Sequence, residues 1–159
     1  MRNKILVLAV VLLCITISSS SAKPYYTTIK EGAIRGYDPV AYFSQSEAKK
    51  GSDEFAYEWE GVVWYFVSEE NLQAFQENPQ KYAPQYGGFC AYAVVNGQVA
   101  VSDPNAWSIH NEKLYLNFNQ QVKNIWLLNK EEYILNADRN WQERVADLIQ
   151  SKQDAHEED

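Results

Sequence analysis

Two stretches of alternating aromatic and polar residues limit most strongly how this chain folds. The first covers residues 55–67 with Glu60-Gly61 at its centre, and the second covers residues 107–118 around Asn111-Glu112. Period-two alternation of β-branched and aromatic residues on both sides of a short polar break is typical of a β-hairpin. The sequence therefore predicts two antiparallel hairpins.

Helical patterns lie around these hairpins. Ser68 is expected to cap a helix that carries acidic residues in its first turn and ends at Asn78-Pro79. The other predicted elements are a short strand over 29–36, a short helix over Ala41–Ala48, a segment 89–95 that fits a helix or a strand, a helix around Val122–Leu127 and a helix from Tyr133 to about Ile149. No internal repeat is found, and strands do not alternate with helices as βαβ units. The predicted class is therefore α+β, a small antiparallel sheet of hairpins packed with short helices.

The first residues have the composition of a secretory signal. Two basic residues precede an apolar run over 5–17, and small residues follow up to Ala22. The run is shorter than the about 20 apolar residues that a membrane-spanning helix needs. We therefore expect a cleaved signal over 1–22 and a secreted or periplasmic protein. An uncleaved anchor and a lipoprotein acylated at Cys14 are the alternatives.

The chain is acidic. Its 159 residues carry 14 Lys and Arg against 21 Asp and Glu, a net charge of −7, and two of the basic residues lie in the expected signal. Such a surface repels the phosphates of nucleic acids and anionic lipid head groups, so neither is an expected partner. The residues after the signal match the common size of one domain, and no membrane span is expected among them.

Several separated motifs carry a resemblance to a known family. They are Gly36–Phe43, Trp64–Asn71 with Phe75, Asn78, Pro79 and Tyr82, then Tyr86–Ala93, Lys113–Asn117 and Ala137–Trp141. Together they resemble the YHS domain family over about residues 33–142, and the last three resemble its exported branch. The resemblance implies a compact treble-clef-like α+β module over 23–142. The signal over 1–22 precedes it, and the end of a C-terminal helix with an acidic tail follows over 143–159.

The resemblance also bears on metal binding. Cysteine-bearing members of the family are associated with heavy-metal handling, and their thiols correspond to Ala41, Val67 and Asn71 of this chain. Because none of the three is a cysteine here, the usual metal site of the family is not carried over. The remaining candidates are Cys90 and His110, and since a thiolate and an imidazole suit a soft ion such as Cu(I), copper is the candidate cofactor. A buried, inert thiol and a surface histidine are the alternative.

Catalysis is not expected. The sequence contains no nucleophile elbow, phosphate-binding loop or dinucleotide-binding glycine motif. Cys90 and His110 are the candidate nucleophile and base, but no basic cluster surrounds the cysteine in the sequence to activate it. The protein is therefore predicted not to be an enzyme.

Aromatic residues near turns and glycines suggest a ligand pocket. The chain has 5 Trp, 11 Tyr and 6 Phe. The candidate pocket residues are Tyr37, Asp38, Tyr42, Tyr86, Tyr92 and Trp107, for a sugar or for an aromatic or planar molecule. The alternative is that these rings form the core, because each aromatic side chain buries about 150–250 Å².

Two function classes follow. The first is an exported binding protein, for a transition metal such as copper or for another ligand. The second is a non-metal interaction or structural module that binds a protein or small-molecule partner. A cleft that gathers Cys90, His110 and carboxylates would favour the first class. Cys90 packed among aromatic rings, with His110 on a distant hairpin tip, would favour the second.

Overall fold

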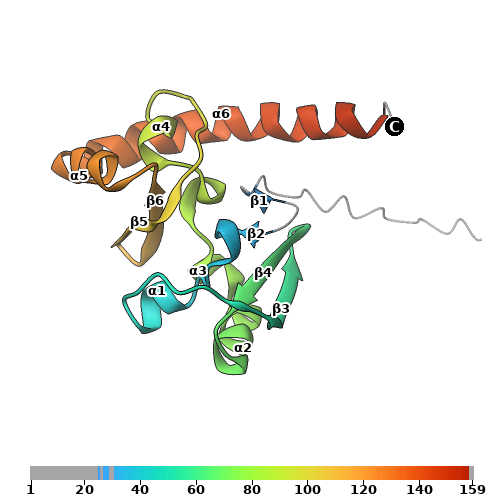
Figure 1. The fold of residues 1–159 in the computed structure, drawn as a ribbon. Coiled ribbons are helices and arrows are strands. Elements are labelled where there is room, and N and C mark those ends of the chain that lie inside the picture. Colours follow the sequence, from blue (N-terminus) through green and yellow to red (C-terminus); the bar gives the residue numbers. More distant parts are fainter. Residues whose placement is uncertain (1–24, 26, 29–30, 158–159) are drawn as a thin grey trace, which may run out of the picture.

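The computed structural model describes residues 25, 27–28 and 31–157, so the signal expected over 1–22 lies outside the described residues. Within them, short helices are interspersed with two-stranded antiparallel sheets (Figure 1). The predicted α+β class is confirmed, and each predicted hairpin forms a sheet of its own. No helix in this part of the chain is long and apolar enough to cross a membrane.

The first half is built around the first predicted hairpin. Strand β3 (Ser52–Trp59) pairs with β4 (Val62–Phe66), and the turn residues Glu60 and Gly61 have φ of 52° and 70°, as a type I′ turn requires. The Ser68 hydroxyl accepts from the N–H of Asn71, which confirms the predicted cap. The other elements are β1 (Thr27–Thr28), β2 (Gly32–Ala33), the 3₁₀ helix η1 (Ile34–Gly36), α1 (Ala41–Ser44), α2 (Glu69–Glu77) and α3 (Pro79–Tyr82).

Two elements in this half are shorter than predicted. The strand expected over 29–36 is limited in the structure to β2, because Ile34 and Arg35 have φ of 49° and 53° and turn the chain; residues 29–30 lie outside the described ones. The helix expected over Ala41–Ala48 ends at Ser44, since Ser46 also has a positive φ, 53°.

The second half follows the same plan. Strand β5 (Asp103–His110) pairs with β6 (Lys113–Asn117), as the second hairpin pattern predicted. The Asn119 side chain accepts from the N–H of Val122 at 2.9 Å and caps the next helix. The other elements are η2 (Gln85–Gly88), α4 (Ala91–Val94), α5 (Gln120–Leu128) and α6 (Lys130–Glu157). The segment that fitted a helix or a strand is therefore helical at α4, and α6 contains the predicted C-terminal helix.

The two halves are copies of one structural unit, offset by 51 positions. The strand pairs from Ser52↔Phe66 to Trp59↔Val62 recur as Asp103↔Asn117 to His110↔Lys113, with the bulge at the same place. Helices α2 and α5 begin and end at equivalent positions. Backbone conformations recur as well, since positive φ is found at both members of Arg35/Tyr86, Gly36/Gly87, Ser46/Gly97, Glu60/Asn111 and Gly61/Glu112.

This repeat is not visible in the sequence. Between residues 34–82 and 85–133, the identical pairs at this spacing are Gly36/Gly87, Asn78/Asn129 and Tyr82/Tyr133. What recurs is conformation and burial: Phe75 on α2 and Trp126 at the equivalent place on α5 are both 0% exposed. The repeat is therefore evident in backbone conformation and burial, and not in residue identity.

Each half has its own hydrophobic cluster, and strand β6 borders both. The first cluster contains Trp64, Phe66 and Phe75, and the second contains Tyr86, Tyr115, Trp126 and Ala137. Successive side chains of a strand point to opposite faces. Leu114 and Leu116 of β6 accordingly belong to the first cluster and Tyr115 to the second. In Figure 1, α6 runs along one side of the molecule with α4 and α5 beside it, and β3, β4 and α2 lie on the other side.

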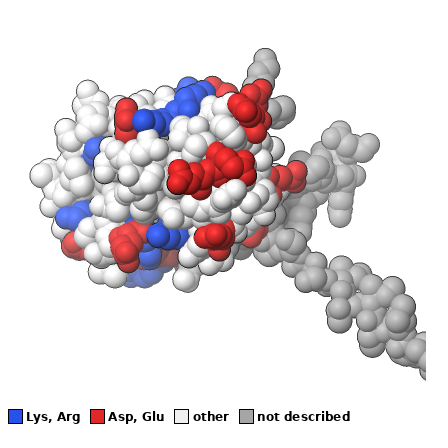
Figure 2. Space-filling view, turned by 90° about the horizontal axis from the view of Figure 1, so that it is seen from below, with Lys and Arg blue, Asp and Glu red and all other residues white. Residues whose placement is uncertain are grey.

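The face turned away from α6 carries several groups of acidic side chains. Figure 2 shows this face, on which acidic side chains gather in several groups and basic side chains lie beside some of them. The exposed acidic residues of β3 and α2 are Asp53, Glu54, Glu58, Glu69, Glu70 and Glu77. The charge of the whole sequence is therefore also a property of the folded surface.

Candidate functional site

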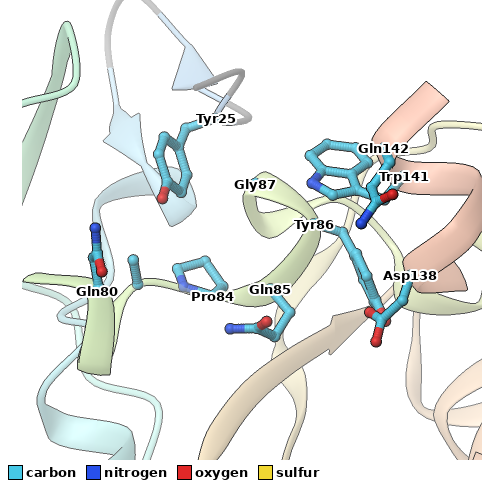
Figure 3. Close-up of a pocket in the computed structure, with 10 residues that line it drawn as sticks. Tyr25, Gln80, Pro84, Gln85, Tyr86, Gly87, Asp138, Trp141 and Gln142 are labelled. Atoms are coloured by element: carbon cyan, nitrogen blue, oxygen red, sulfur yellow. The ribbon is translucent and has the colours of Figure 1, made fainter. Parts of the chain in front are cut away.

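A cleft of about 500 Å³ lies between the two halves. Its volume falls within the range of about 300–1,000 Å³ that is typical of small-molecule sites. The lining residues come from both halves and from the connection between them: Tyr25, Gln80, Ala83, Pro84, Gln85, Tyr86, Gly87, Asp138, Trp141 and Gln142. Figure 3 shows Tyr25, Gln80 and Pro84 on one side and Trp141, Gln142 and Asp138 on the other, with Gly87 between them.

Tyr86 is the central polar residue of this cleft. It is 5% exposed, and its hydroxyl donates to Oδ1 of Asp138 across 2.9 Å. Its φ of 54° is uncommon for a bulky residue. The equivalent Arg35 of the first half has the same conformation, so the turn is required by the repeated fold. The side chain is what distinguishes the two halves: Arg35 is exposed and faces Glu31, whereas Tyr86 is buried against helix α6.

The walls of the cleft are aromatic. Tyr25 packs against Trp59 and Trp64 of the first cluster, at ring-centroid distances of 5.5 and 5.2 Å. On the opposite wall, Trp141 lies 5.9 Å from the ring of Tyr86 at an interplanar angle of 68°. Each wall is thus held by the core of its own half, which fixes the rings before any ligand arrives.

Both phenols at the cleft are neutral hydrogen-bonding groups at physiological pH. Burial, followed by the hydrogen bond to Asp138, raises the pKa of Tyr86. Burial, followed by the charge of Glu60, raises the pKa of Tyr25 to about 12. A neutral phenol donates one hydrogen bond and accepts others, so each ring combines an apolar face with a polar end.

The polar lining is uncharged except at one residue. Three amide side chains contribute to it, those of Gln80, Gln85 and Gln142. Among the described lining residues, Asp138 is the one carboxylate and there is no Lys, Arg or His. The site therefore offers hydrogen-bond donors and acceptors together with apolar ring surface, and a single negative charge.

Of the six predicted pocket residues, Tyr86 is the one that lines this cleft. Asp38 is 0% exposed, and its carboxylate is fully engaged. Oδ1 accepts from the N–H of Val40 and of Ala41, and Oδ2 accepts from the N–H of Val67 and from the amide of Asn71. Asp38 therefore connects η1, α1, β4 and α2 through hydrogen bonds, and its role is structural.

Ala41, Val67 and Asn71, named above for the absence of a cysteine, all belong to this network. In the structure, a backbone or side-chain N–H of each of the three donates to Asp38.

The other four predicted pocket residues lie elsewhere. Tyr42 is 0% exposed, donates its hydroxyl to the carbonyl of Pro104 and contacts Trp107 at 5.3 Å. Tyr37 is partly buried, with the ammonium of Lys50 over its ring. Tyr92 meets Tyr133 of α6 edge-on at 5.4 Å. These rings hold secondary-structure elements together, as the alternative interpretation expects, in which they form the core and not a ligand pocket.

The two predicted metal ligands have separate partners. Cys90 is 2% exposed, and its sulfur lies 3.8 Å from Oδ1 of Asn117. His110 lies at the end of β5, with Nε2 2.9 Å from Oε2 of Glu131 on α6. Cys90 is bridged to Leu116 whereas His110 pairs with Lys113, and three positions along a strand span about 10 Å. The structure therefore does not place the thiol and the imidazole side by side.

Within the described residues, no three His, Cys, Asp or Glu side chains are grouped closely enough to hold a metal ion. A smaller cavity of about 280 Å³ does lie beside His110. Its other lining residues are Asn111, Lys113, Tyr115, Glu131, Ile134 and Leu135. The His110–Glu131 contact connects the hairpin tip to α6 there and does not converge with Cys90.

Sequence analysis missed most of the cleft because its walls come from distant segments. Tyr25, Gln80 and Trp141 are brought together by the packing of the two halves. A signal did exist: Tyr86-Gly87 and Asp138 to Trp141 belong to two of the motifs that resemble the exported YHS branch.

Comparison of the chain with protein-family models, with curated proteins and with solved structures finds no match. Function is therefore inferred from the chemistry of the site.

Proposed function

We propose that this chain is an exported, non-catalytic binding protein of the YHS type, whose ligand is a small organic molecule held in the cleft between the two halves. One observation carries the proposal. Aromatic rings from both halves, three amide side chains and the Tyr86–Asp138 pair line one cleft of about 500 Å³. Convergent polar groups in an aromatic cleft are the usual features of a small-molecule site.

The lining supports binding rather than catalysis. Covalent catalysis needs a nucleophile with a base within hydrogen-bond reach, and the lining residues that the structure describes include no Ser, Thr, Cys, Lys or His. Hydrolysis by paired carboxylates needs a second acid, and Asp138 is the one carboxylate among these described residues. The side chains present can hold and orient a ligand, and the expected signal would bring it into contact with molecules outside the cytoplasm.

The cleft supports this function better than Cys90 and His110 support copper binding. The thiol is buried against Asn117, and the imidazole contacts Glu131. A site built from both would require a change in the packing of β6. By contrast, the residues of the cleft already face one another (Figure 3).

Chemical-shift mapping tests the proposal. The purified, isotope-labelled protein is mixed with pools of small soluble compounds that cover sugars, nucleosides, amines, carboxylates and planar aromatics. We expect at least one class to shift the resonances of Tyr86, Gly87 and Trp141, including the indole N–H. Trp141→Ala should abolish that response. If no pool perturbs these residues, or if the shifts gather at Cys90 or His110 instead, the proposed site is wrong.

A further inference from the structure

We infer that the ligand of the cleft is a neutral, polyhydroxylated ring, that is, a saccharide; this inference rests on the proposed function. Three properties of the cleft lead to it: its charge, the kind of hydrogen bonds that it offers and its aromatic surface. Each narrows the ligand class further.

Charge excludes anionic ligands. Among the residues that the structure describes, the lining contains Asp138 and no Lys, Arg or His, so none of these side chains would neutralise a phosphate, sulfate or carboxylate. The protein as a whole has a net charge of −7. A site lined by one sign of charge lowers the local concentration of ligands of that same sign. The ligand is therefore neutral or cationic.

The hydrogen-bonding groups favour hydroxyls. Each of Gln80, Gln85 and Gln142 presents an acceptor oxygen and a donor NH₂ on one planar group. A sugar hydroxyl donates and accepts through the same oxygen, and neighbouring hydroxyls on a ring can satisfy both ends of one amide. A quaternary ammonium has no donor to give to these amides, and a planar hydrocarbon ring would leave their polar atoms without partners, which is costly.

One oxygen of Asp138 is positioned by the protein itself. Tyr86 donates to Oδ1, and this bond fixes the orientation of the carboxylate at the cleft. Hydrogen bonds from a hydroxyl to a carboxylate are among the stronger ones, at about twice the strength of neutral pairs. Asp138 is therefore the residue that we expect to hold one sugar hydroxyl through Oδ2.

The aromatic surface suits the apolar face of a sugar ring. Trp141 is contacted by Tyr86 at an interplanar angle of 68° and by Phe89 at 53°, so neither ring is stacked parallel to the indole. Trp141 is only partly buried and lies at the edge of the cleft, across from Tyr25 (Figure 3). The C–H groups on one face of a pyranose can pack on such an indole while its hydroxyls point sideways to the amides.

The test uses neutral oligosaccharides as probes. The labelled protein is titrated with cellobiose, maltotriose, chitobiose and mannobiose. Choline, resorcinol and a glucuronic acid disaccharide serve as the cationic, planar and anionic counterparts. We expect at least one neutral oligosaccharide to shift Tyr86, Gly87 and the Trp141 indole in a saturable way, and the glucuronic acid counterpart to bind at least about tenfold more weakly.

Matched variants identify the contacts. Trp141→Ala should weaken sugar binding by about tenfold or more, and Trp141→Phe, which keeps an aromatic ring at the edge of the cleft, should recover part of it. Gln142→Ala should also weaken binding, whereas Gln76→Ala, an exposed glutamine on α2 outside the cleft, should not. Asp138→Asn should weaken binding while the fold, followed by circular dichroism, is kept.

The outcomes distinguish the saccharide inference from the proposed small-molecule site on which it rests. If choline or resorcinol shifts the cleft residues and no neutral sugar does, the saccharide inference is overturned and the proposed small-molecule site stands. If no probe of any class shifts them, both are overturned. Sugar binding that survives Trp141→Ala and Gln142→Ala with unchanged affinity would also overturn the inference, since the sugar would then lie elsewhere.

Discussion

The side-chain amide of Asn71 donates a hydrogen bond of 2.7 Å to Oδ2 of the buried carboxylate of Asp38. The two residues lie 33 positions apart, and their contact fastens α2 to the turn before α1. Three backbone N–H groups, those of Val40, Ala41 and Val67, complete the shell around the carboxylate. A buried charge with this many donors is well compensated.

Removing the carboxylate should therefore destabilise the protein strongly. Asp38→Ala leaves several buried N–H groups without an acceptor, and we expect a loss of about 3 kcal/mol or more in the free energy of unfolding. Urea denaturation followed by tryptophan fluorescence measures it. Asp53→Ala, which removes an exposed carboxylate on β3, is the control and should change stability by less than about 0.5 kcal/mol. Equal effects of the two substitutions would contradict the structural place given to Asp38.

At equivalent positions of the two hairpin turns, we expect substitutions to change stability in opposite directions. Gly61 has φ of 70° with nothing within 4 Å of an added Cβ, so Gly61→Ala should cost about 1 kcal/mol through backbone strain alone. Glu112 occupies the same position in the second hairpin, with φ of 58°. Glu112→Gly should relieve that strain and stabilise by about 0.5–1 kcal/mol. Thermal unfolding of both variants checks the pair, and a destabilised Glu112→Gly would count against the equivalence of the turns.

Buried tyrosines predict a loss of stability at alkaline pH. Burial raises the pKa of Tyr25 and of Tyr115 to about 12 and raises that of Tyr42 and Tyr86 as well. The folded state thus holds these protons more tightly than the unfolded state, whose phenols titrate near pH 10. The contribution to stability is complete below pH about 10 and is lost as the pH rises toward about 12.

Denaturation midpoints measured from about pH 8 upward, together with near-ultraviolet absorbance of the phenolates, check this behaviour. Tyr86→Phe should be less stable at neutral pH, because Asp138 loses a hydrogen-bond donor, and its stability should fall less steeply above pH about 10. Midpoints that stay constant up to pH about 12 would show that burial does not protect these phenols.

The thiol of Cys90 should be inaccessible in the folded protein. Because it is 2% exposed, a thiol reagent should modify it only as fast as the protein opens, and quickly in denaturant. The same preparation tests copper binding by Cu(I) titration against a chelator. Stoichiometric binding that is lost in both Cys90→Ala and His110→Ala would show that the two side chains meet, in contradiction to their separate partners in the structure.

The elements could be predicted from the sequence where local chemistry decides them. Glu60-Gly61 and Asn111-Glu112 mark turns, and Ser68 marks a helix start, because each acts on its immediate neighbours. The site was not predictable in this way. Tyr25, Gln80 and Trp141 meet only through the packing of the two halves, so no window of sequence contains the cleft.

Asp38 and Tyr42 were predicted as pocket residues, whereas the structure buries both of them. Both lie beside a proline turn, where an exposed binding residue and a buried structural one have the same local pattern. Burial, which decides between these two interpretations, depends on β4, β5 and α2, far away in the sequence.

Strand β6 couples the stability of the two halves, because its alternate side chains enter two different hydrophobic clusters. A shift of its pairing by a single residue would withdraw Leu114 and Leu116 from one interior and Tyr115 from the other in the same step. Neither half can therefore melt while the other keeps its native interior. A chain made of two copies of one unit should for this reason unfold as a single cooperative body, and a ligand in the cleft would stabilise both copies at once.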